Sequence, residues 1–269
     1  MRGRTVSMHG LASYKPRPQS AFRLFCFPYA GGSAHIYRRW AEHLPAQVDV
    51  CPVNLPGRAQ RLKEQPGTRM LPLAETIMRE ILPLLDKPFA FFGYSMGALL
   101  AFEIARLLRR NSLPEPAHLF VAARSGPQIA NADRLTYNMP EKELLEELRR
   151  LSGTSEEVLD EPELMKVVLP LIRADFELIQ NYTYTPEPPL GCSISVYGGL
   201  QDREVSRERL QAWCQQTEAS CILRMFPGGH FFINTAREVL LQTLTRELYQ
   251  HQLLSPDLST VGTPARREP

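Results

Sequence analysis

The sequence predicts an α/β protein with a mostly parallel central sheet flanked by helices, and three observations indicate it. Short apolar runs alternate along the chain with longer segments of helical periodicity, which is the pattern of successive strand–helix–strand units. The 269 residues are enough for one sizeable core. Hydrophobic residues at 43% and charged residues at 22% are typical of a globular domain.

The strands are expected where short, mostly apolar runs lie between turn residues. We place them at 22–27, 48–53, 88–92, 117–123, 192–198 and 220–226. Pro52 indicates that 48–53 is an edge strand, because proline cannot donate a hydrogen bond to a neighbouring strand. The continuously apolar run 88–92 (PFAFF) is typical of a strand that is buried on both faces of a parallel sheet.

The helices are expected where apolar residues recur with helical spacing. We place them at 34–44, 72–85, 96–110, 204–217 and 236–252. In the first of these the periodic residues are Ile36, Trp40 and Leu44. The helix at 96–110 ends in three arginines, whose positive charges suit a helix C-terminus.

Residues 130–185 interrupt this alternation. They contain helical pieces at 141–151 and 163–181 and no convincing strand. An insertion between two strands of an open α/β sheet would lie over the carboxyl edge of the sheet, where such folds bind ligands. We therefore interpret this segment as a helical lid.

One folded domain is expected to span 21–253. Residues 1–20 are basic and lack the apolar core of a signal peptide, and 254–269 are rich in proline, serine and threonine, so both ends are expected to be disordered. No apolar stretch requires a membrane span, and we expect a cytoplasmic protein. A net charge of +2 is too small to favour nucleic-acid binding.

The five cysteines are interpreted as buried free thiols in a reducing compartment. Their number is odd, no two form a C-x-x-C pair, and four of the five lie in or beside apolar runs. These spacings do not favour a metal site. The five residues are Cys26, Cys51, Cys192, Cys214 and Cys221.

Residues 93–97 (GYSMG) match G-x-S-x-G, the pattern of a nucleophilic serine on a strand-to-helix turn. The pattern alone is weak, but here an apolar strand precedes it and an apolar helix follows. Gly93 and Gly97 leave room between these elements and tolerate unusual dihedral angles. The helix N-terminus behind Ser95 favours negative charge developing nearby. We predict Ser95 as the nucleophile of an α/β-hydrolase fold; an ordinary strand–helix turn is the alternative.

A serine nucleophile needs an imidazole base that follows it in the chain. His230 lies in a glycine loop just after the strand at 220–226. His118 opens a strand and His251 lies at the far end of the last helix, so both are weaker candidates. We predict His230 as the base.

The base needs an orienting carboxylate, and Asp202 lies just past the strand at 192–198. Glu204 begins a helix, whose dipole it complements, and Asp175 lies within the lid, far from the base. We predict Asp202 as the acid, with Glu204 and Asp175 as its competitors.

Acyl chemistry also needs backbone N–H donors for an oxyanion. Met96, directly after the nucleophile, supplies one. The loop 28–33 (PYAGGS) follows the first strand, and its glycines permit close backbone approach. We predict Ala30 as the second donor, with Tyr29 in reserve and a plain glycine turn as the alternative. Tyr29 and Phe231 are expected to contact the substrate.

Four motifs follow one another in the chain: FPYAGGS (27–33), LPGR (55–58), DKPFAFFGYSMGALLAFE (86–103) and PGGHFF (227–232). In this order they resemble the type II thioesterases of modular polyketide synthases and nonribosomal peptide synthetases, a family with a branch that serves animal fatty acid synthase. The resemblance covers roughly residues 22–250, and IRADF (172–176) is similar to the family's lid helix. Tyr94 departs from it, because many members carry histidine there.

The resemblance implies that Ser95 attacks the thioester carbonyl of an acyl group on the phosphopantetheine arm of an acyl or peptidyl carrier protein. His230 would transfer the protons and water would release the acid. It implies editing of stalled or aberrant acyl units, with a carrier protein as partner and without a cofactor or metal; we expect a monomer. A medium-chain fatty acyl thioesterase, a small-molecule serine esterase and an acyltransferase are alternatives. A non-catalytic binding module is a further one, but it would be expected to have lost the triad.

Two further groups of residues have two interpretations each. The basic residues are candidates for docking an acidic carrier protein, with a solvated surface as the alternative: Arg38, Arg39, Arg58, Arg61 and Lys63. The lid leucines share one helical face and are candidates for lining an acyl channel, with ordinary packing as the alternative: Leu144, Leu148 and Leu151.

Overall fold

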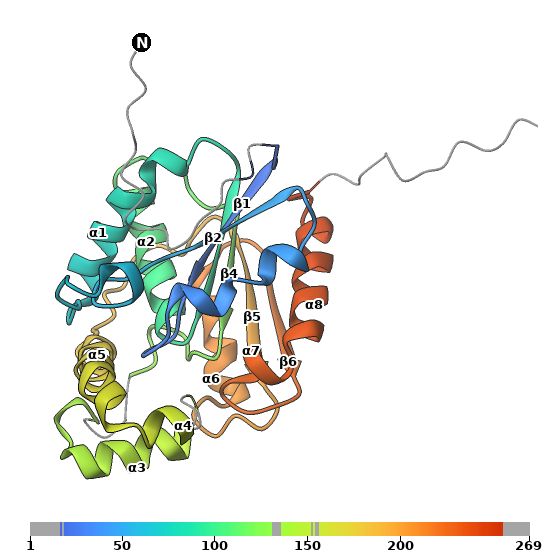
Figure 1. Cartoon of the computed structure of the whole chain (residues 1–269). Helices are drawn as coiled ribbons and strands as arrows, with labels where there is room; N and C mark the ends of the chain where they lie inside the picture. Colours follow the sequence, from blue (N-terminus) through green and yellow to red (C-terminus); the bar gives the residue numbers. More distant parts are fainter. Residues whose placement is uncertain (1–16, 18, 131–135, 152, 154–155, 255–269) are drawn as a thin grey trace, which may run out of the picture.

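Six strands form one parallel sheet in the computed structural model, which describes residues 17, 19–130, 136–151, 153 and 156–254 (Figure 1). The strands are β1 (Phe22–Phe27), β2 (Val48–Pro52), β3 (Phe89–Tyr94), β4 (His118–Ala122), β5 (Ser193–Gly199) and β6 (Cys221–Phe226). Their order is β2-β1-β3-β4-β5-β6, and every neighbouring pair is parallel. The predicted sheet is confirmed, with β2 at an edge.

Helices cover both faces of the sheet (Figure 1). Helices α1 (Met70–Ile81) and α2 (Met96–Arg110) pack on one face, and α8 (Arg237–Gln250) packs on the other. Successive side chains of β3 point to opposite faces of the sheet. Phe91 packs in the core under α1 and α2, and Phe92 packs in the core under α8. This alternation explains why the strand is apolar at every position.

The predicted helix at 34–44 is wrong, because two short 3-10 turns occupy it, η1 (Ala34–Tyr37) and η2 (Trp40–Glu42). Tertiary packing explains the apolar spacing there. The Tyr37 and Trp40 rings are buried against Phe92, and the Tyr37 hydroxyl donates to the carbonyl oxygen of Phe27 at 2.7 Å. Of the three periodic residues, Trp40 and Leu44 are buried and Ile36 is half-buried, so the spacing reflected packing without an α-helix.

Two other predicted helices are shorter than expected. The segment 72–85 is α1 followed by the 3-10 turn η4 (Leu82–Leu84), where Pro83 lacks the N–H that an α-helix needs. The segment 204–217 consists of α6 (Arg207–Gln211) and the 3-10 turn η6 (Ala212–Gln216). The remaining short elements are η3 (Ala59–Arg61), η5 (Thr136–Asn138) and α7 (Phe232–Thr235).

The chain between β4 and β5 forms a helical insertion beyond the carboxyl edge of the sheet (Figure 1). Its helices are α3 (Glu141–Leu151), α4 (Glu156–Leu159) and α5 (Pro162–Gln180). A separate small core holds them together, and Leu144 is completely buried in it. The two helical pieces predicted for the lid segment are confirmed as α3 and α5.

The interpretation of all five cysteines as free thiols is wrong for two of them. Cys214 in η6 and Cys221 at the start of β6 form a disulfide, with their Cα atoms 5.3 Å apart. The turn between η6 and β6 brings the two side chains together at a separation suited to a disulfide. Cys26, Cys51 and Cys192 lie outside this disulfide and keep their thiols.

The ends predicted to be disordered lie mostly outside the described residues, which omit 1–16, 18 and 255–269. Where the ends are described they contact the domain: the Arg17 guanidinium donates to the carbonyl oxygen of Ala41 at 2.7 Å, and Leu254 is buried. Among the described residues, no helix is both long and apolar enough to cross a lipid bilayer.

Candidate active site

Ser95 stands on a sharp turn between β3 and α2 with φ 51° and ψ −111°, a conformation that L-residues rarely adopt. The flanking glycines make the turn possible. A Cβ on Gly93 would lie far inside contact distance of the Gly97 backbone, and a Cβ on Gly97 would collide with the carbonyl oxygen of Phe27. The motif is therefore required by the close packing of α2 against β1 and β3.

The structure brings Ser95, His230 and Asp202 together from the loops that follow β3, β6 and β5. Nε2 of His230 lies 3.2 Å from Oγ of Ser95, and Nδ1 lies 3.0 Å from Oδ2 of Asp202. Because the strands are parallel, their carboxyl ends meet at one edge, and loops distant in sequence converge there. The arrangement is a continuous hydrogen-bonded relay from an alcohol to a carboxylate.

Asp202 is held in place by backbone donors. Its Oδ1 accepts hydrogen bonds from the amides of Glu204 and Val205, at 2.8 and 3.2 Å. Its side chain is fully buried, so these bonds and His230 satisfy a carboxylate that water does not reach. Oδ1 of Asp202 therefore accepts from the loop amides, and Oδ2 pairs with the imidazole of His230.

The competing acids are occupied elsewhere. The Glu204 carboxylate forms a two-point ion pair with Arg150, at 2.7 and 3.0 Å. The Asp175 carboxylate is buried in α5, paired with Arg58. These two carboxylates pair with arginines, whereas the carboxylate of Asp202 pairs with His230.

The competing histidines lie at the amino ends of the parallel strands, whereas Ser95 lies at their carboxyl ends. His118 is the first residue of β4 and its Nε2 lies 2.8 Å from Oγ of Ser195, a contact separate from the relay. Burial and the neighbouring His251 lower the pKa of His118 to about 3, which makes its imidazole a weak base. His251 caps the C-terminus of α8.

Tyr94 supports the histidine loop, a role that the sequence did not indicate. Its hydroxyl donates to the backbone carbonyl oxygen of His230 at 2.5 Å and accepts from the amide of Ile233 at 3.3 Å. The ring is buried, and burial raises the pKa of its hydroxyl well above the usual value. The residue after the first glycine of G-x-S-x-G therefore anchors the histidine loop in this protein.

The early loop offers backbone donors next to Ser95. The Gly31 amide donates to Oδ2 of Asp175 at 2.7 Å, and the Gly32 amide donates to the carbonyl oxygen of Tyr29 at 2.9 Å. These two amides are therefore occupied, and Ala30 as the second oxyanion donor, with Tyr29 in reserve, stays a prediction. Met96 is the first residue of α2, where helix amides have no partner within the helix.

Two of the arginines considered for carrier docking are buried. Arg58 pairs with Asp175, and Arg61 pairs with Glu64 and Glu80. Both guanidinium groups are buried in these ion pairs, so carrier docking and a solvated surface are both wrong for Arg58 and Arg61. The other three candidates are exposed: Arg38, Arg39 and Lys63.

A cavity of about 320 Å³ opens beside Ser95 and His230. Tyr29 and Phe231 line it, with their rings in edge contact at 5.0 Å between centroids. The insertion lines the same cavity with both apolar and polar residues: Thr136, Met139, Glu147, Leu148, Arg150, Leu151, Gly153, Ile172, Phe176, Ile179 and Gln180. Of the three lid leucines, Leu148 and Leu151 line the cavity, and Leu144 packs inside the insertion.

The parallel sheet, the serine on its strand-to-helix turn and the helical insertion over the carboxyl edge define an α/β hydrolase. A family model described as the thioesterase domain matches residues 22–248, and the chain belongs to this family. It is a hydrolase of thioester bonds, and the family resemblance is confirmed.

Individual relatives agree with this assignment. The chain is 41% identical over 226 residues to the gramicidin S biosynthesis protein GrsT of Aneurinibacillus migulanus, covering 84% of this chain and 88% of that protein. RedJ, a thioesterase from the prodiginine biosynthetic pathway in Streptomyces coelicolor, superposes with a TM-score of 0.81 at 38% identity, covering 87% of this chain and 88% of RedJ. BorB, the type II thioesterase from the borrelidin biosynthetic cluster, gives 0.80 at 35% identity, covering 87% and 96%.

Proposed function

We propose that this thioesterase removes acyl groups from the phosphopantetheine arm of a carrier protein, as an editing enzyme of polyketide or nonribosomal peptide biosynthesis. The observation that carries the proposal is the relay of Ser95, His230 and Asp202, which opens into a cavity walled by the insertion. The likeness to proteins of such pathways supports the carrier-bound substrate. The enzyme acts as a monomer in the cytoplasm, where it meets the carrier.

In the first step Ser95 attacks the thioester carbonyl carbon, and His230 takes the hydroxyl proton. The negative charge on the carbonyl oxygen is stabilised by the amides of Met96 and Ala30, a contribution of about 3 kcal/mol for each such donor. Asp202 stabilises the imidazolium. When the intermediate collapses, the carbon–sulfur bond breaks and His230 returns the proton to the leaving thiolate.

In the second step water releases the acid. His230 takes a proton from a water molecule, whose oxygen attacks the acyl-serine carbonyl in the same oxyanion site. The serine oxygen then leaves and recovers its proton from His230. The protein's own side chains and amides supply the nucleophile, the base and the oxyanion donors, so these steps call for no metal or cofactor.

The walls of the cavity indicate where the acyl group lies. Tyr29 and Phe231 line the cavity together with Ser95, and apolar side chains of the insertion, such as Leu148 and Phe176, line it as well. Burial of an acyl chain there is favourable because apolar surface leaves water on both sides. The insertion acts as a lid in this proposal, since it must admit a substrate carried on a second protein.

The test is a panel of acyl-carrier thioesters and matched oxygen esters, assayed with the wild type, Ser95→Ala and Ser206→Ala. Ser206 is an exposed helix-capping serine and serves as the control. We expect thioester hydrolysis to fall at least about 10⁴-fold in Ser95→Ala and to stay unchanged in Ser206→Ala. A fluorophosphonate should label Ser95 alone. A clear preference of the wild type for oxygen esters would reject the carrier-thioester assignment.

A further inference from the structure

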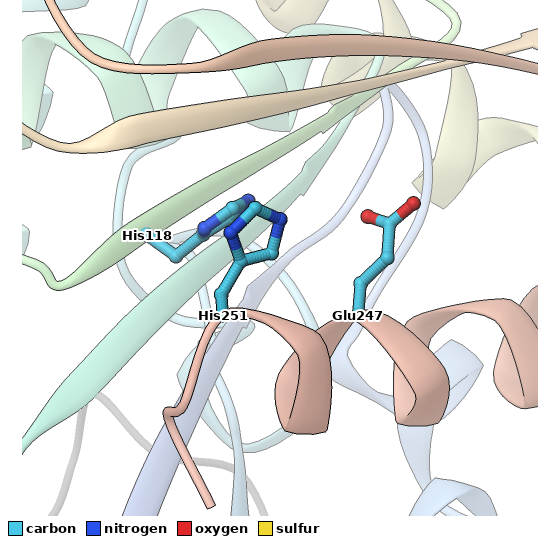
Figure 2. A group of neighbouring side chains, drawn as sticks. All are labelled: His118, Glu247 and His251. Atoms are coloured by element: carbon cyan, nitrogen blue, oxygen red, sulfur yellow. The ribbon is translucent and has the colours of Figure 1, made fainter.

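Two histidines and a glutamate lie close together near the amino ends of the strands, whereas Ser95 lies at the carboxyl ends. His118 begins β4, and Glu247 and His251 lie one helical turn apart at the end of α8. One ligand atom from each lies within 4.8 Å of the other two. Figure 2 shows the two imidazoles close together, with the Glu247 carboxylate rising from the neighbouring turn of α8 toward the sheet.

Among the residues that the structure describes, each of the two imidazoles has a buried nitrogen without a hydrogen-bond partner. These atoms are Nδ1 of His118 and Nε2 of His251, and the rings lie 4.4 Å apart between centroids. His118 is almost completely buried, with 1% of its surface exposed. A buried polar atom without a partner is unfavourable, and such atoms in a native protein often mark a missing ion or water.

The second ring nitrogen of His118 has a hydrogen-bond partner that can orient the imidazole for metal binding. Its Nε2 lies 2.8 Å from Oγ of Ser195. When Nε2 carries the proton and donates it to this hydroxyl, Nδ1 keeps a lone pair that is available to an ion. Metal-binding histidines commonly use their second nitrogen in this way, which orients the ring.

Glu247 supplies a negative charge to the same place. Its side chain is fully buried and accepts hydrogen bonds from the Tyr197 hydroxyl and the Arg224 guanidinium, both at 2.9 Å. Each carboxylate oxygen has two lone pairs, so these bonds leave capacity for a cation. The outer partners also limit the movement of the carboxylate.

We infer that His118, Glu247 and His251 bind a divalent transition metal ion, with zinc as the best match to two imidazoles and a carboxylate. Ligand atoms around tetrahedral zinc lie roughly 3.3 Å apart, so binding closes the present spacing by at most roughly 1.5 Å. His251 is partly exposed and gives the ion a path of entry, with water as the fourth ligand. The ion would fasten the end of α8 to β4, away from the hydrolytic relay.

The test uses the full chain without an affinity tag, stripped of metal with a chelator and then titrated with zinc chloride by calorimetry. We expect one ion per chain with a dissociation constant in the micromolar range or below. Cobalt(II) should give the intense visible absorption of a tetrahedral site. Both signals should disappear in His118→Gln and His251→Gln and persist in the control His35→Gln, which alters an exposed histidine.

Ser195→Ala gives a second, milder variant, since it removes only the partner of His118. We expect it to weaken zinc binding by about tenfold, as for other outer partners of metal ligands. Thioester hydrolysis by the metal-free variants reports whether they are folded, because none of these residues touches the relay. Binding that persists in His118→Gln and inhibits hydrolysis would place the ion at His230 instead. Absence of zinc binding by the folded wild type would show that the three side chains do not form a metal site, and either result would overturn the inference.

Discussion

Arg58 and Asp175 form a buried, two-point ion pair that joins the turn after β2 to α5 of the insertion. Nη2 and Nη1 of Arg58 lie 2.7 and 3.0 Å from the two carboxylate oxygens, and both side chains are at least nine-tenths buried. The same Oδ2 accepts the Gly31 amide, and Arg58 donates to the carbonyl oxygen of Gly32 at 2.8 Å. One pair therefore links the insertion to the loop that carries the Ala30 amide.

Asp175→Asn should lower both stability and turnover. It leaves Arg58 as an unpaired buried charge, which typically lowers the free energy of unfolding by about 3 kcal/mol. We also expect kcat to fall about tenfold, with a smaller change in KM, because the loop of Ala30, the proposed oxyanion donor, loses an anchor. Urea unfolding and steady-state hydrolysis of an acyl thioester measure the two effects.

The control for this variant is Asp160→Asn, which removes an exposed partner of Arg149. Exposed ion pairs contribute little, so we expect a change in stability within about 0.5 kcal/mol and an unchanged kcat. If Asp175→Asn hydrolyses its substrate as fast as the wild type, the ion pair has no influence on the oxyanion loop.

Gly97→Ala should destabilise the protein by at least about 3 kcal/mol, or prevent its folding. The new methyl group would collide with the backbone of Phe27 and Pro28, which cannot move without separating α2 from β1. Gly191→Ala is the matched control, because within the described part of the chain no atom lies within 4 Å of a Cβ built there. Thermal unfolding compares the two, and equal losses would show that the collision is relieved by small shifts.

Asp202→Asn should reduce kcat by roughly 10⁴-fold with little loss of stability, since the amide cannot hold His230 in the required tautomer. Single-turnover hydrolysis of an acyl thioester measures the effect. Glu204→Gln, two residues away, changes a carboxylate that pairs with Arg150, and we expect it to keep kcat within tenfold of the wild type. A larger loss in Glu204→Gln than in Asp202→Asn would exchange the roles of the two acids.

Tyr94→Phe should lower kcat about tenfold, because the His230 loop loses the hydroxyl that donates to its backbone. Tyr182→Phe removes a hydroxyl that donates to Glu103 at 2.7 Å, far from the relay. Each change should lower the free energy of unfolding by about 1–2 kcal/mol. Only the first should alter kcat and its pH profile; parallel kinetics for the two variants would reduce Tyr94 to a structural role.

Local chemistry explains why much of this protein is readable from its residues. Helix α2 occupies the predicted 96–110 because an apolar strand, a glycine-flanked serine and a run of helix-forming residues are neighbours in the chain. The segment 34–44 shows the limit of such signals. Its apolar spacing was real, but Tyr37 and Trp40 owe their burial to Phe92, which comes much later in the sequence.

The sequence by itself determined the alternation of strands and helices, the nucleophile turn and the loops from which a base and an acid could come, since these depend on residues that are close in the chain. Only the tertiary structure decided which carboxylate meets His230, that Arg58 pairs with Asp175 across 117 positions, and that His118 faces His251. Such pairs form between residues that are distant in the sequence and that the fold brings into contact. The physical reason is that a side chain's partner is chosen by packing in space, which no local pattern records.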